Sequence, residues 1–261
     1  MIDFSIIVTI KNRKEHFLKT FSSLLTQQQP QNYEIIFVDY SSQDGFEHAL
    51  KEQIQNYLPL VSDSLCLVKR IYLQKDFDFN SGRAKNIGAK FSSSSLLSFT
   101  DADVFLGMNY HNHWLHILSY TSNSFFVSRV QETTECNAHR ISPKTNYGNM
   151  IISKNKFIEI GGYNENNTSW GGDDDDIIHR LKLKNLREIN PHSVYDSLQT
   201  SILHDDELRT KFLENNEKSI ELSKLKFEEI YKNSCPINSN FLSFYNENKS
   251  LIQVEKIYEK S

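Results

Sequence analysis

The chain is poor in cysteine, glycine and proline. Among its 261 residues it has 3 Cys, 9 Gly and 5 Pro. The low glycine and proline content excludes collagen-like or proline-rich material. The cysteines, Cys66, Cys136 and Cys235, are odd in number and far apart, so neither a zinc site nor a redox pair is indicated. We expect buried or idle thiols in a reducing compartment.

Long apolar runs and a charge excess of one sign are also missing. No stretch reaches the roughly 18 unbroken apolar residues that a membrane-spanning helix needs. The net charge of −4 excludes a generically basic nucleic-acid-binding protein. Met1 runs into an apolar segment without a basic leader, which predicts a soluble, cytoplasmic protein. Hydrophobic residues, at 38%, are sufficient for a substantial core, which argues against whole-chain disorder.

Apolar runs of strand length alternate with helical patterns over the first hundred residues. Strands are expected over 4–10, 33–39, 65–73 and 96–100, and helices over 17–25, 46–58 and from residue 80. Strands joined by helices form right-handed βαβ units, so the sequence predicts an α/β fold with a mostly parallel sheet flanked by helices. Ligands bind beyond the carboxyl ends of such strands, where Thr9, Asp39 and Asp101 lie. These three residues are expected at one crevice.

The second half has a less regular pattern. A helix is expected over 114–120, strands over 124–130 and 148–152, and a helix over 177–186 that follows an acidic run. Beyond residue 212 the chain is rich in Lys, Glu and Asn, which favours a peripheral helix with a frayed end. We therefore expect one domain over 1–214, with halves 1–103 and 104–214, and a peripheral helical tail over 215–261.

Two aspartates, Asp101 and Asp103, follow the fourth predicted strand with one alanine between them. Their like charges would repel unless a cation or a hydrogen-bonding shell compensates, and a hard divalent ion that bridges to phosphate oxygens would do so. The alternative is a solvated turn, because pairs of aspartates are common in turns. Placement at the end of a strand favours the metal.

The string 170–176 reads Trp-Gly-Gly followed by four aspartates, directly before an apolar helical pattern. An acidic first turn of a helix accounts for one or two carboxylates but not for four. Trp170 would add an aromatic face, and the glycines allow close approach of the backbone to a ligand. A sugar ring, with one carboxylate as general base, would use all of these features.

The histidines give weaker signals. His204 could complete the coordination of a metal held by Asp103, although a lone histidine is more often a surface residue or one satisfied in the core. The same alternative applies to His111 and His113, which receive no role. Where the third helix should begin, three polar side chains could neutralise a diphosphate or simply form a polar helix face: Asn80, Arg83 and Lys85.

Taken together, these residues resemble the GT-A-fold inverting glycosyltransferases of the bacterial family-2 type. The opening segments 4–9 and 34–45 are similar to that family. Further blocks, in the family's order, resemble the β-1,4-galactosyltransferase and chondroitin-synthase type: KNRKEH at 11–16, RAKNIG at 83–88, FTDAD at 99–103 with MN at 108–109, GGY at 161–163, WGGDDDDI at 170–177 and RL at 180–181. The resemblance spans roughly residues 4 to 206. The tail lies outside it.

The resemblance implies a GT-A (Rossmann-like) fold and transfer of a hexose or N-acetylhexosamine from a UDP-sugar to a glycan hydroxyl. It implies Asp174 as catalytic base and Mn²⁺, or Mg²⁺, under the diphosphate. The metal ligands are then Asp103, His204 and Asp101. The donor site comprises Thr9, Asn12, Arg13, Asp39, Asn80, Arg83, Lys85, Asp101 and Gly148. The acceptor site comprises Trp170, Gly171, Gly172, Asp173 and Asp175.

The chain departs from the family pattern at two positions. Asp173 replaces the usual Glu, and Ser201 stands near the place where animal members use a sulfur ligand. Thr145 lies near the position that contacts the C2 substituent of the donor, where a small residue leaves room for an N-acetyl group. UDP-GalNAc is therefore an option beside UDP-Gal.

Two other functions fit parts of the pattern. A nucleotidyltransferase also uses a doubly wound sheet and metal-bound aspartates, but it would want a glycine-rich phosphate loop after the first strand, where this chain has none. A non-catalytic metal- or carbohydrate-binding module would use the acidic loops for adhesion alone. Bacterial relatives lead us to expect a polysaccharide or lipid-linked saccharide acceptor, with peripheral contact at the inner face of the membrane and no nucleic-acid partner.

Overall fold

The structure is a computed structural model of the 261-residue chain. It describes residues 2–27, 32–57, 63–107, 109–112, 114, 123–133, 139–167, 172–189, 202–204, 238 and 240–260. Three stretches within these, 128–133, 139–147 and 202–204, are described through their backbone alone. Most of the helix predicted over 114–120 and the predicted domain boundary at residue 214 lie outside the described residues.

Strands and helices alternate in the first hundred residues, which confirms the expected α/β pattern. The elements there are β1 (Phe4–Ile10), α1 (Lys14–Leu25), β2 (Tyr33–Asp39), α2 (Phe46–Tyr57), β3 (Leu65–Leu73), α3 (Ser81–Phe91) and β4 (Leu96–Asp101). The later elements are β5 (Val104–Leu106), β6 (Ser124–Thr133), β7 (His139–Ser153), α5 (Lys154–Glu159), α6 (Asp173–Leu183), β8 (Arg187–Ile189), β9 (Ile202–His204), α10 (Ser243–Asn248), the 3-10 helix η2 (Lys249–Leu251) and β10 (Ile252–Glu259). Among the described residues, no helix has the length and apolar character needed to cross a bilayer.

The strands of the described residues form one mixed sheet. Its order is β10-β3-β2-β1-β4-β7-β6-β9-β5, and β8 pairs with β6. β1 pairs in parallel with β2 and with β4, and β2 pairs in parallel with β3. β10 and β7 run antiparallel to β3 and β4, at the two sides of this parallel centre. The parallel centre matches the prediction from the βαβ pattern.

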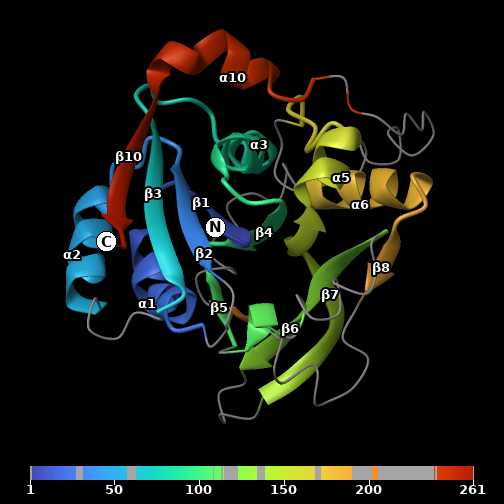
Figure 1. Ribbon diagram of the computed structural model, residues 1–261, viewed down its shortest axis with the longest axis horizontal. Helices are drawn as coiled ribbons and strands as arrows, with labels where there is room; N and C mark the ends of the chain where they lie inside the picture. Colours follow the sequence, from blue (N-terminus) through green and yellow to red (C-terminus); the bar gives the residue numbers. More distant parts are fainter. Residues whose placement is uncertain are drawn as a thin grey trace.

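Helices cover both faces of the sheet (Figure 1). α1 and α2 pack on one face, and α3, α5 and α6 pack on the other. Successive residues of β1 point to opposite faces, so Ile6 packs in the core with Phe17 of α1 while Ile7 packs with Ile87 of α3. Because both faces are buried, the central strands are continuous apolar runs. Cys66, on β3, is a free thiol, and the other two cysteines lie outside the described residues.

The four aspartates form the first turn of α6, so both bounds predicted by the pattern over 177–186 are wrong. α6 begins at Asp173, after Gly172 in the left-handed conformation with φ of 81°. Carboxylates in a first helical turn are stabilised by the positive end of the macrodipole, which accounts for the early start. The helix ends at Leu183 because Asn185 adopts a left-handed φ of 58°, which the apolar periodicity does not reveal.

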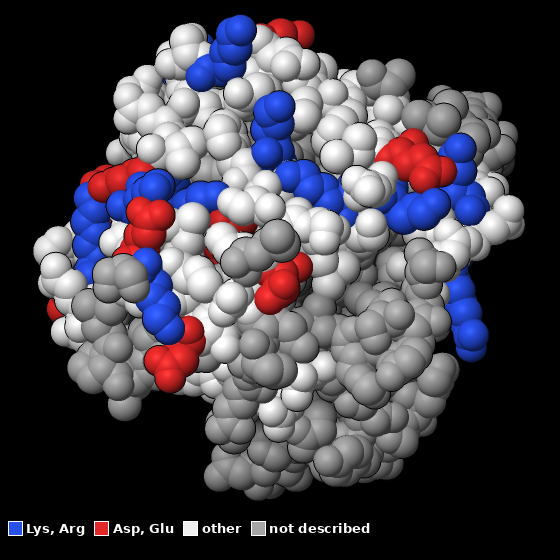
Figure 2. Space-filling model, in the orientation of Figure 1, with Lys and Arg blue, Asp and Glu red and all other residues white. Residues whose placement is uncertain are grey.

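The C-terminal tail is only partly helical. α10 and η2 are helical, but residues 252–259 form β10, which pairs antiparallel with β3. A helix or frayed end over 252–259 was therefore a wrong prediction, because pairing with the open edge of β3 outweighs the helix propensity of Lys and Glu. Figure 2 shows acidic and basic side chains mixed over β10 and α2, where Lys51 pairs with Glu255 at 2.8 Å. Charges on an edge strand discourage pairing with other molecules.

His113 lies outside the described residues. His111 is a buried core histidine, which is the alternative that the sequence left open. Its side chain is fully buried, with Nδ1 3.2 Å from Gln27 Oε1 and Nε2 2.9 Å from Ser98 Oγ. Since an amide oxygen only accepts, Nδ1 donates to Gln27 and Nε2 accepts from the Ser98 hydroxyl. The neutral ring thus satisfies both contacts, and burial lowers the pKa of His111 to about 3.

This buried histidine should make folding sensitive to mild acid. Between pH 6.5 and about 3 the unfolded chain binds a proton at His111 that the folded chain does not, so stability falls as pH falls through this window. We expect His111 to contribute about 1.4 kcal/mol of lost stability per pH unit below 6.5. Urea unfolding at pH 7 and pH 5.5 measures it: His111→Gln should be less stable at pH 7 but less dependent on pH. His48→Gln, at an exposed histidine, is the control. If the free energy of unfolding changes with pH equally in the wild type and in His111→Gln, this account is contradicted.

Candidate active site

The carboxyl ends of neighbouring strands bring the predicted residues together. In the register of the sheet, Thr9 on β1 lies opposite Asp101 on β4, and Ile10 lies opposite Asp39 on β2. The parallel arrangement expected from the sequence therefore places Thr9, Asp39 and Asp101 along one edge of the sheet. α3 begins near this edge, with Asn80 as its N-cap.

A buried lysine joins two of the acidic motifs. Lys85, on α3, is 1% exposed, and its Nζ lies 3.0 Å from Asp174 Oδ1 and 3.9 Å from Asp101 Oδ1. It also lies over the ring of Tyr163, 4.9 Å from the centroid. Asp174 and Asp101 keep 30% and 34% of their side-chain area exposed, so both carboxylates are partly buried while the cation between them is enclosed. α3, α6 and β4 therefore converge at this point.

Burial and neighbouring charges change the proton affinity of these groups. Burial raises the pKa of Asp174 and of Asp101, while the Lys85 ammonium acts in the opposite direction. Burial and the charge of Asp174 raise the pKa of Asp173 to about 6. For Lys85, burial alone would lower the pKa, but Asp174 and its neighbours raise it well above 10.5. The lysine therefore stays protonated, and the carboxylates hold protons more readily than exposed aspartates.

The residues predicted to hold a metal lie close along the backbone. β5 begins at Val104, directly after Asp103, and pairs with β9 so that Val104 lies opposite His204. The side chain of His204 is outside the described part, and within that part no group of three or more His, Cys, Asp or Glu side chains gathers around a common point. Asp101 and Asp103 offer carboxylate oxygens, the ligands that Mn²⁺ and Mg²⁺ prefer, and the coordination by His204 stays a prediction.

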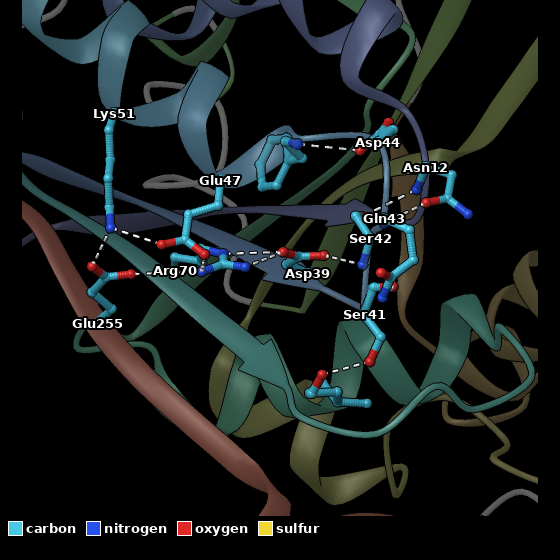
Figure 3. Close-up of polar contacts among 12 residues, drawn as sticks. Asn12, Asp39, Ser41, Ser42, Gln43, Asp44, Glu47, Lys51, Arg70 and Glu255 are labelled. Atoms are coloured by element: carbon cyan, nitrogen blue, oxygen red, sulfur yellow. Dashed lines mark hydrogen bonds and ion pairs between the residues drawn. The ribbon is translucent and has the colours of Figure 1, made fainter.

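Asp39 is enclosed by protein at the end of β2 (Figure 3). Its Oδ2 accepts hydrogen bonds from Arg70 Nε at 3.0 Å and Nη2 at 2.7 Å, and its Oδ1 accepts from the amide of Ser42 at 2.8 Å. Arg70, on β3, also pairs with Glu47 of α2 at 2.7 Å. Sequence reasoning missed Arg70, although an arginine inside an apolar strand indicates a buried carboxylate partner. The predicted contact of Asp39 with a nucleotide stays a prediction.

The loop after β1 packs against the loop after β2 (Figure 3). Asn12 has a left-handed φ of 51°; its amide donates to Ser42 Oγ at 3.1 Å, and its Oδ1 accepts from the amide of Gln43 at 2.8 Å. Arg13 Nη1 lies 3.0 Å from His16 Nε2. Asn12 and Arg13 therefore border the same sheet edge as Asp39.

Asn80 and Arg83 lie at the start of α3, as predicted. Asn80 Oδ1 accepts from the amide of Arg83 at 2.8 Å, which caps the helix. Asn80 Nδ2 and Arg83 Nε both donate to the backbone carbonyl of Glu165, at 3.3 and 3.1 Å. The other predicted donor residue, Gly148, is buried at the irregularity where β7 shifts register against β6. Glu165 was not singled out from the sequence.

Three of the five predicted acceptor residues, Gly172, Asp173 and Asp175, lie in the part of the chain that the structure describes. Trp170 and Gly171 lie outside the described residues. Gly172 is the left-handed N-cap of α6, and Asp173 and Asp175 belong to its first turn together with Asp174. The fourth aspartate has a structural role that the sequence pattern did not reveal: buried Asp176 Oδ2 accepts from Arg180 Nε and Nη2, at 3.0 and 2.6 Å, and Arg180 Nη1 donates to the carbonyl of Ile160.

The sequence model of glycosyl transferase family 2 matches residues 5–163, which include β1 to β4 and the aspartates that follow them. The chain belongs to glycosyl transferase family 2. A second model, described as the N-terminal domain of galactosyltransferase, matches residues 130–201, which include α6 and the acidic run. The expected relationship to the family is therefore confirmed. Lys85 and Asp101 lie within the first match, and Asp174 lies within the second.

Relatives of known sequence include galactosyltransferases. The chain is 24% identical over 194 residues to β-1,4-galactosyltransferase 1 of Bos taurus, covering 73% of this chain and 39% of the relative. It is 25% identical, over the same shares of both chains, to β-1,4-galactosyltransferase 1 of Mus musculus. The family-2 chain thus spans about two fifths of the length of these curated relatives.

Solved structures share the fold. TarS of S. aureus, over residues 1–349, superposes with a TM-score of 0.56 at 15% identity, covering 78% of this chain and 60% of that one. The mannosyltransferase PcManGT from Pyrobaculum calidifontis, in complex with GDP-Man and Mn²⁺, gives 0.59 at 15% identity over 77% and 56%. GalNAc-T7 with UDP, GalNAc and Mn²⁺ gives 0.58 at 16% identity over 78% and 44%. The GT-A fold expected for a family-2 chain is confirmed.

Proposed function

We propose that the chain is a metal-dependent inverting glycosyltransferase that moves a hexose or N-acetylhexosamine from a UDP-sugar to a hydroxyl of a glycan acceptor. The observation that carries this proposal is the position of Asp174, which is held by Lys85 next to Asp101. The motif expected to supply the base and the motif expected to supply the metal thus meet at one lysine. Membership of family 2 and the likeness to β-1,4-galactosyltransferases support this reaction class.

In the proposed reaction Asp174 acts as general base. It takes the proton of the acceptor hydroxyl while that oxygen forms a bond to the anomeric carbon and the bond from this carbon to the diphosphate breaks. UDP leaves with the electron pair of the broken bond, and the single displacement inverts the anomeric centre. Burial raises the pKa of Asp174, which makes its carboxylate a stronger base than an exposed aspartate. Lys85 holds this carboxylate in place.

Asp101, Asp103 and His204 would hold the divalent cation, Mn²⁺ or Mg²⁺. The register that sets Val104 opposite His204, and the two carboxylates at the end of β4, support this set. Such a cation, when bound, offsets the negative charge that develops on the departing UDP. Lys85 also carries charge of the right sign toward the same place.

The donor and acceptor would lie on the two sides of Asp101 and Asp174. We assign the nucleotide and diphosphate to Thr9, Asn12, Arg13, Asp39, Asn80, Arg83, Lys85 and Gly148, which line or border the carboxyl edge of the sheet. We assign the acceptor sugar to Trp170, Gly171, Gly172, Asp173 and Asp175 around the start of α6. Gal and GalNAc are the favoured donor sugars. The likeness to β-1,4-galactosyltransferases favours Gal, and Thr145, small where the C2 substituent is expected, leaves room for the N-acetyl group of GalNAc.

Binding of UDP should stabilise the folded chain only when a divalent cation is present. A ligand that binds only the folded state raises the free energy of unfolding by mass action, by roughly 2.7 kcal/mol at a concentration 100 times its Kd. For a chain of this size that corresponds to an increase in Tm on the order of 5–10 °C. Melting curves with UDP, with MnCl₂ and with both measure it. A rise in Tm with UDP alone that a chelator does not affect would contradict the assignment of a metal to the site.

Product analysis separates the proposal from its rivals. Release of UDP from UDP-Gal or UDP-GalNAc, raised by a glycan acceptor, identifies a glycosyltransferase, whereas pyrophosphate release from UTP identifies a nucleotidyltransferase. Binding of glycan that is indifferent to nucleotide identifies a binding module. Rates with UDP-Glc equal to those with UDP-Gal and UDP-GalNAc would contradict the assignment of the donor sugar. The anomeric configuration of the product, read by NMR, tests inversion.

A further inference from the structure

Residues 238 and 240–244, here called the C-terminal segment, lie against the loop 160–165, which precedes the expected acceptor motif at 170–176. Asn238 bonds to this loop through its amide, which donates to the carbonyl of Ile160 at 3.0 Å, and through Nδ2, which donates to Gly161 at 3.0 Å and Tyr163 at 2.7 Å. Gly161 has a φ of 76°, and a Cβ there would lie 2.1 Å from the carbonyl oxygen of Asn238. Glycine is therefore required at this position because another stretch of the backbone passes so close.

Glu165, at the end of this loop, fixes the start of α10. Its side chain is 2% exposed. Oε1 accepts from the amide of Leu242 at 3.0 Å and from Asn86 Nδ2 at 2.8 Å, and Oε2 accepts from the amide of Phe244 at 2.8 Å and from Ser243 Oγ at 2.9 Å. Leu242 has a left-handed φ of 59°, which a leucine adopts only when surrounding contacts enforce it. Four donors thus converge on one buried carboxylate, three of them from the C-terminal segment.

The same residue contacts the expected diphosphate site through its backbone. The carbonyl oxygen of Glu165 accepts from Arg83 Nε at 3.1 Å and from Asn80 Nδ2 at 3.3 Å. The guanidinium carbon of Arg83 lies 5.0 Å from the ring centroid of Phe244, whose amide is bound by the Glu165 side chain. One edge and one face of the guanidinium are therefore held by groups that Glu165 fixes. A planar guanidinium held in this way presents its terminal amino groups in a set direction.

We infer that Glu165 is a positioning residue of the donor site, through which the C-terminal segment sets the orientation of Arg83 toward the diphosphate of the nucleotide sugar. This inference rests on the proposed function, because it takes Arg83 as a ligand of the donor. Glu165 does not touch the substrate. Its contribution lies in holding the Arg83 guanidinium ready before the donor binds, which lowers the entropy that binding costs.

Glu165→Gln tests this with little change in volume. One carboxylate oxygen becomes an NH₂ group that faces either the Leu242 and Asn86 donors or the Ser243 and Phe244 donors, so half of the contacts are lost. We expect the Kd for UDP with Mn²⁺, measured by calorimetry on the full chain, to rise about tenfold, which corresponds to about 1.4 kcal/mol. The KM for the donor should rise in parallel, while kcat and the KM for the acceptor stay within about twofold.

Two further variants show whether the effect passes through Arg83. In an Arg83→Ala background, Glu165→Gln should change the Kd for UDP by less than about twofold, because the residue it positions is gone. Glu159→Gln, on α5, makes the same substitution at a half-exposed glutamate whose partner is Lys156, and it should leave the Kd unchanged. Ser243→Ala removes one donor of the four and should raise the Kd by a smaller factor; it serves in place of Glu165→Gln if that variant does not fold.

The outcomes are separable. If the wild type does not bind UDP with Mn²⁺, the proposed function fails. If the wild type binds and Glu165→Gln binds equally well, the positioning role alone is refuted. An equal rise of the Kd in the wild-type and Arg83→Ala backgrounds, or a fall in kcat with an unchanged donor KM, would show that Glu165 only supports the fold.

Discussion

Replacement of Asp174 by asparagine is expected to lower kcat by about 10²–10⁴-fold, the contribution that a positioned general base makes. Asparagine has nearly the same shape but accepts no proton from the acceptor hydroxyl at neutral pH. The fold should be retained, because Asp174 is partly exposed and its loss relieves repulsion with Asp101 and Asp175. The Lys85 ammonium stays close to Asp101. Initial rates of UDP release in the presence of acceptor measure the effect.

Binding measurements on the same variant separate catalysis from folding. Asp174→Asn should keep the Tm increase given by UDP and Mn²⁺, because the base is not assigned to the nucleotide. Asp63→Asn, at a fully exposed aspartate, is the matched control and should retain wild-type rates. Turnover of Asp174→Asn within a few-fold of wild type would mean that another group takes the proton.

Loss of the Arg70 side chain should cause the largest fall in stability. Arg70→Met leaves the Asp39 carboxylate, only 1% exposed, without its cation, and removes one of the two cations that pair with Glu47. Breaking a buried pair in this way costs about 3–5 kcal/mol, because one charge stays buried and uncompensated. We expect Tm to fall by on the order of 10 °C, measured by calorimetry. Urea unfolding should show the same loss in free energy.

The neighbouring edge strand offers the control for this substitution. Lys256→Met, on β10, removes a lysine that pairs with Glu259 where both side chains are about 60% exposed. Exposed pairs contribute only about 0–1 kcal/mol, so this variant should unfold close to wild type. A loss below about 1 kcal/mol for Arg70→Met would mean that Asp39 finds another partner or takes up a proton at little cost.

The parallel centre of the fold could be predicted from local patterns. Apolar runs separated by helical periodicity predict β1 to β4, and in β1 and β2 burial on both faces leaves no polar alternation. β10 could not be predicted in this way. Ile252, Val254 and Ile257 favour a strand, but Lys and Glu are interspersed among them, so the local pattern is ambiguous and pairing with the open edge of β3 decides it.

The site shows the same division. Thr9, Asp39 and Asp101 were placed together because parallel strand ends meet at one edge, a rule of topology that needs no side-chain detail. The contact of Lys85 with Asp174 joins residues of α3 and α6 that are far apart in sequence, so no spacing rule indicates it. Glu165 was missed for the same reason, since three of its four donors come from the C-terminal segment.

β10 also determines when the protein can finish folding during synthesis. Ile252 pairs with Leu73 and Glu259 pairs with Leu67, so β3 has no partner on one side until the ribosome has released the chain through residue 259. Until then the nascent sheet carries an open edge next to the strand that supplies Arg70, and open edges invite pairing with other chains. Contacts between such distant residues form late and slowly. Growing chains of this protein therefore expose the edge of β3 until residues 252–259 have emerged.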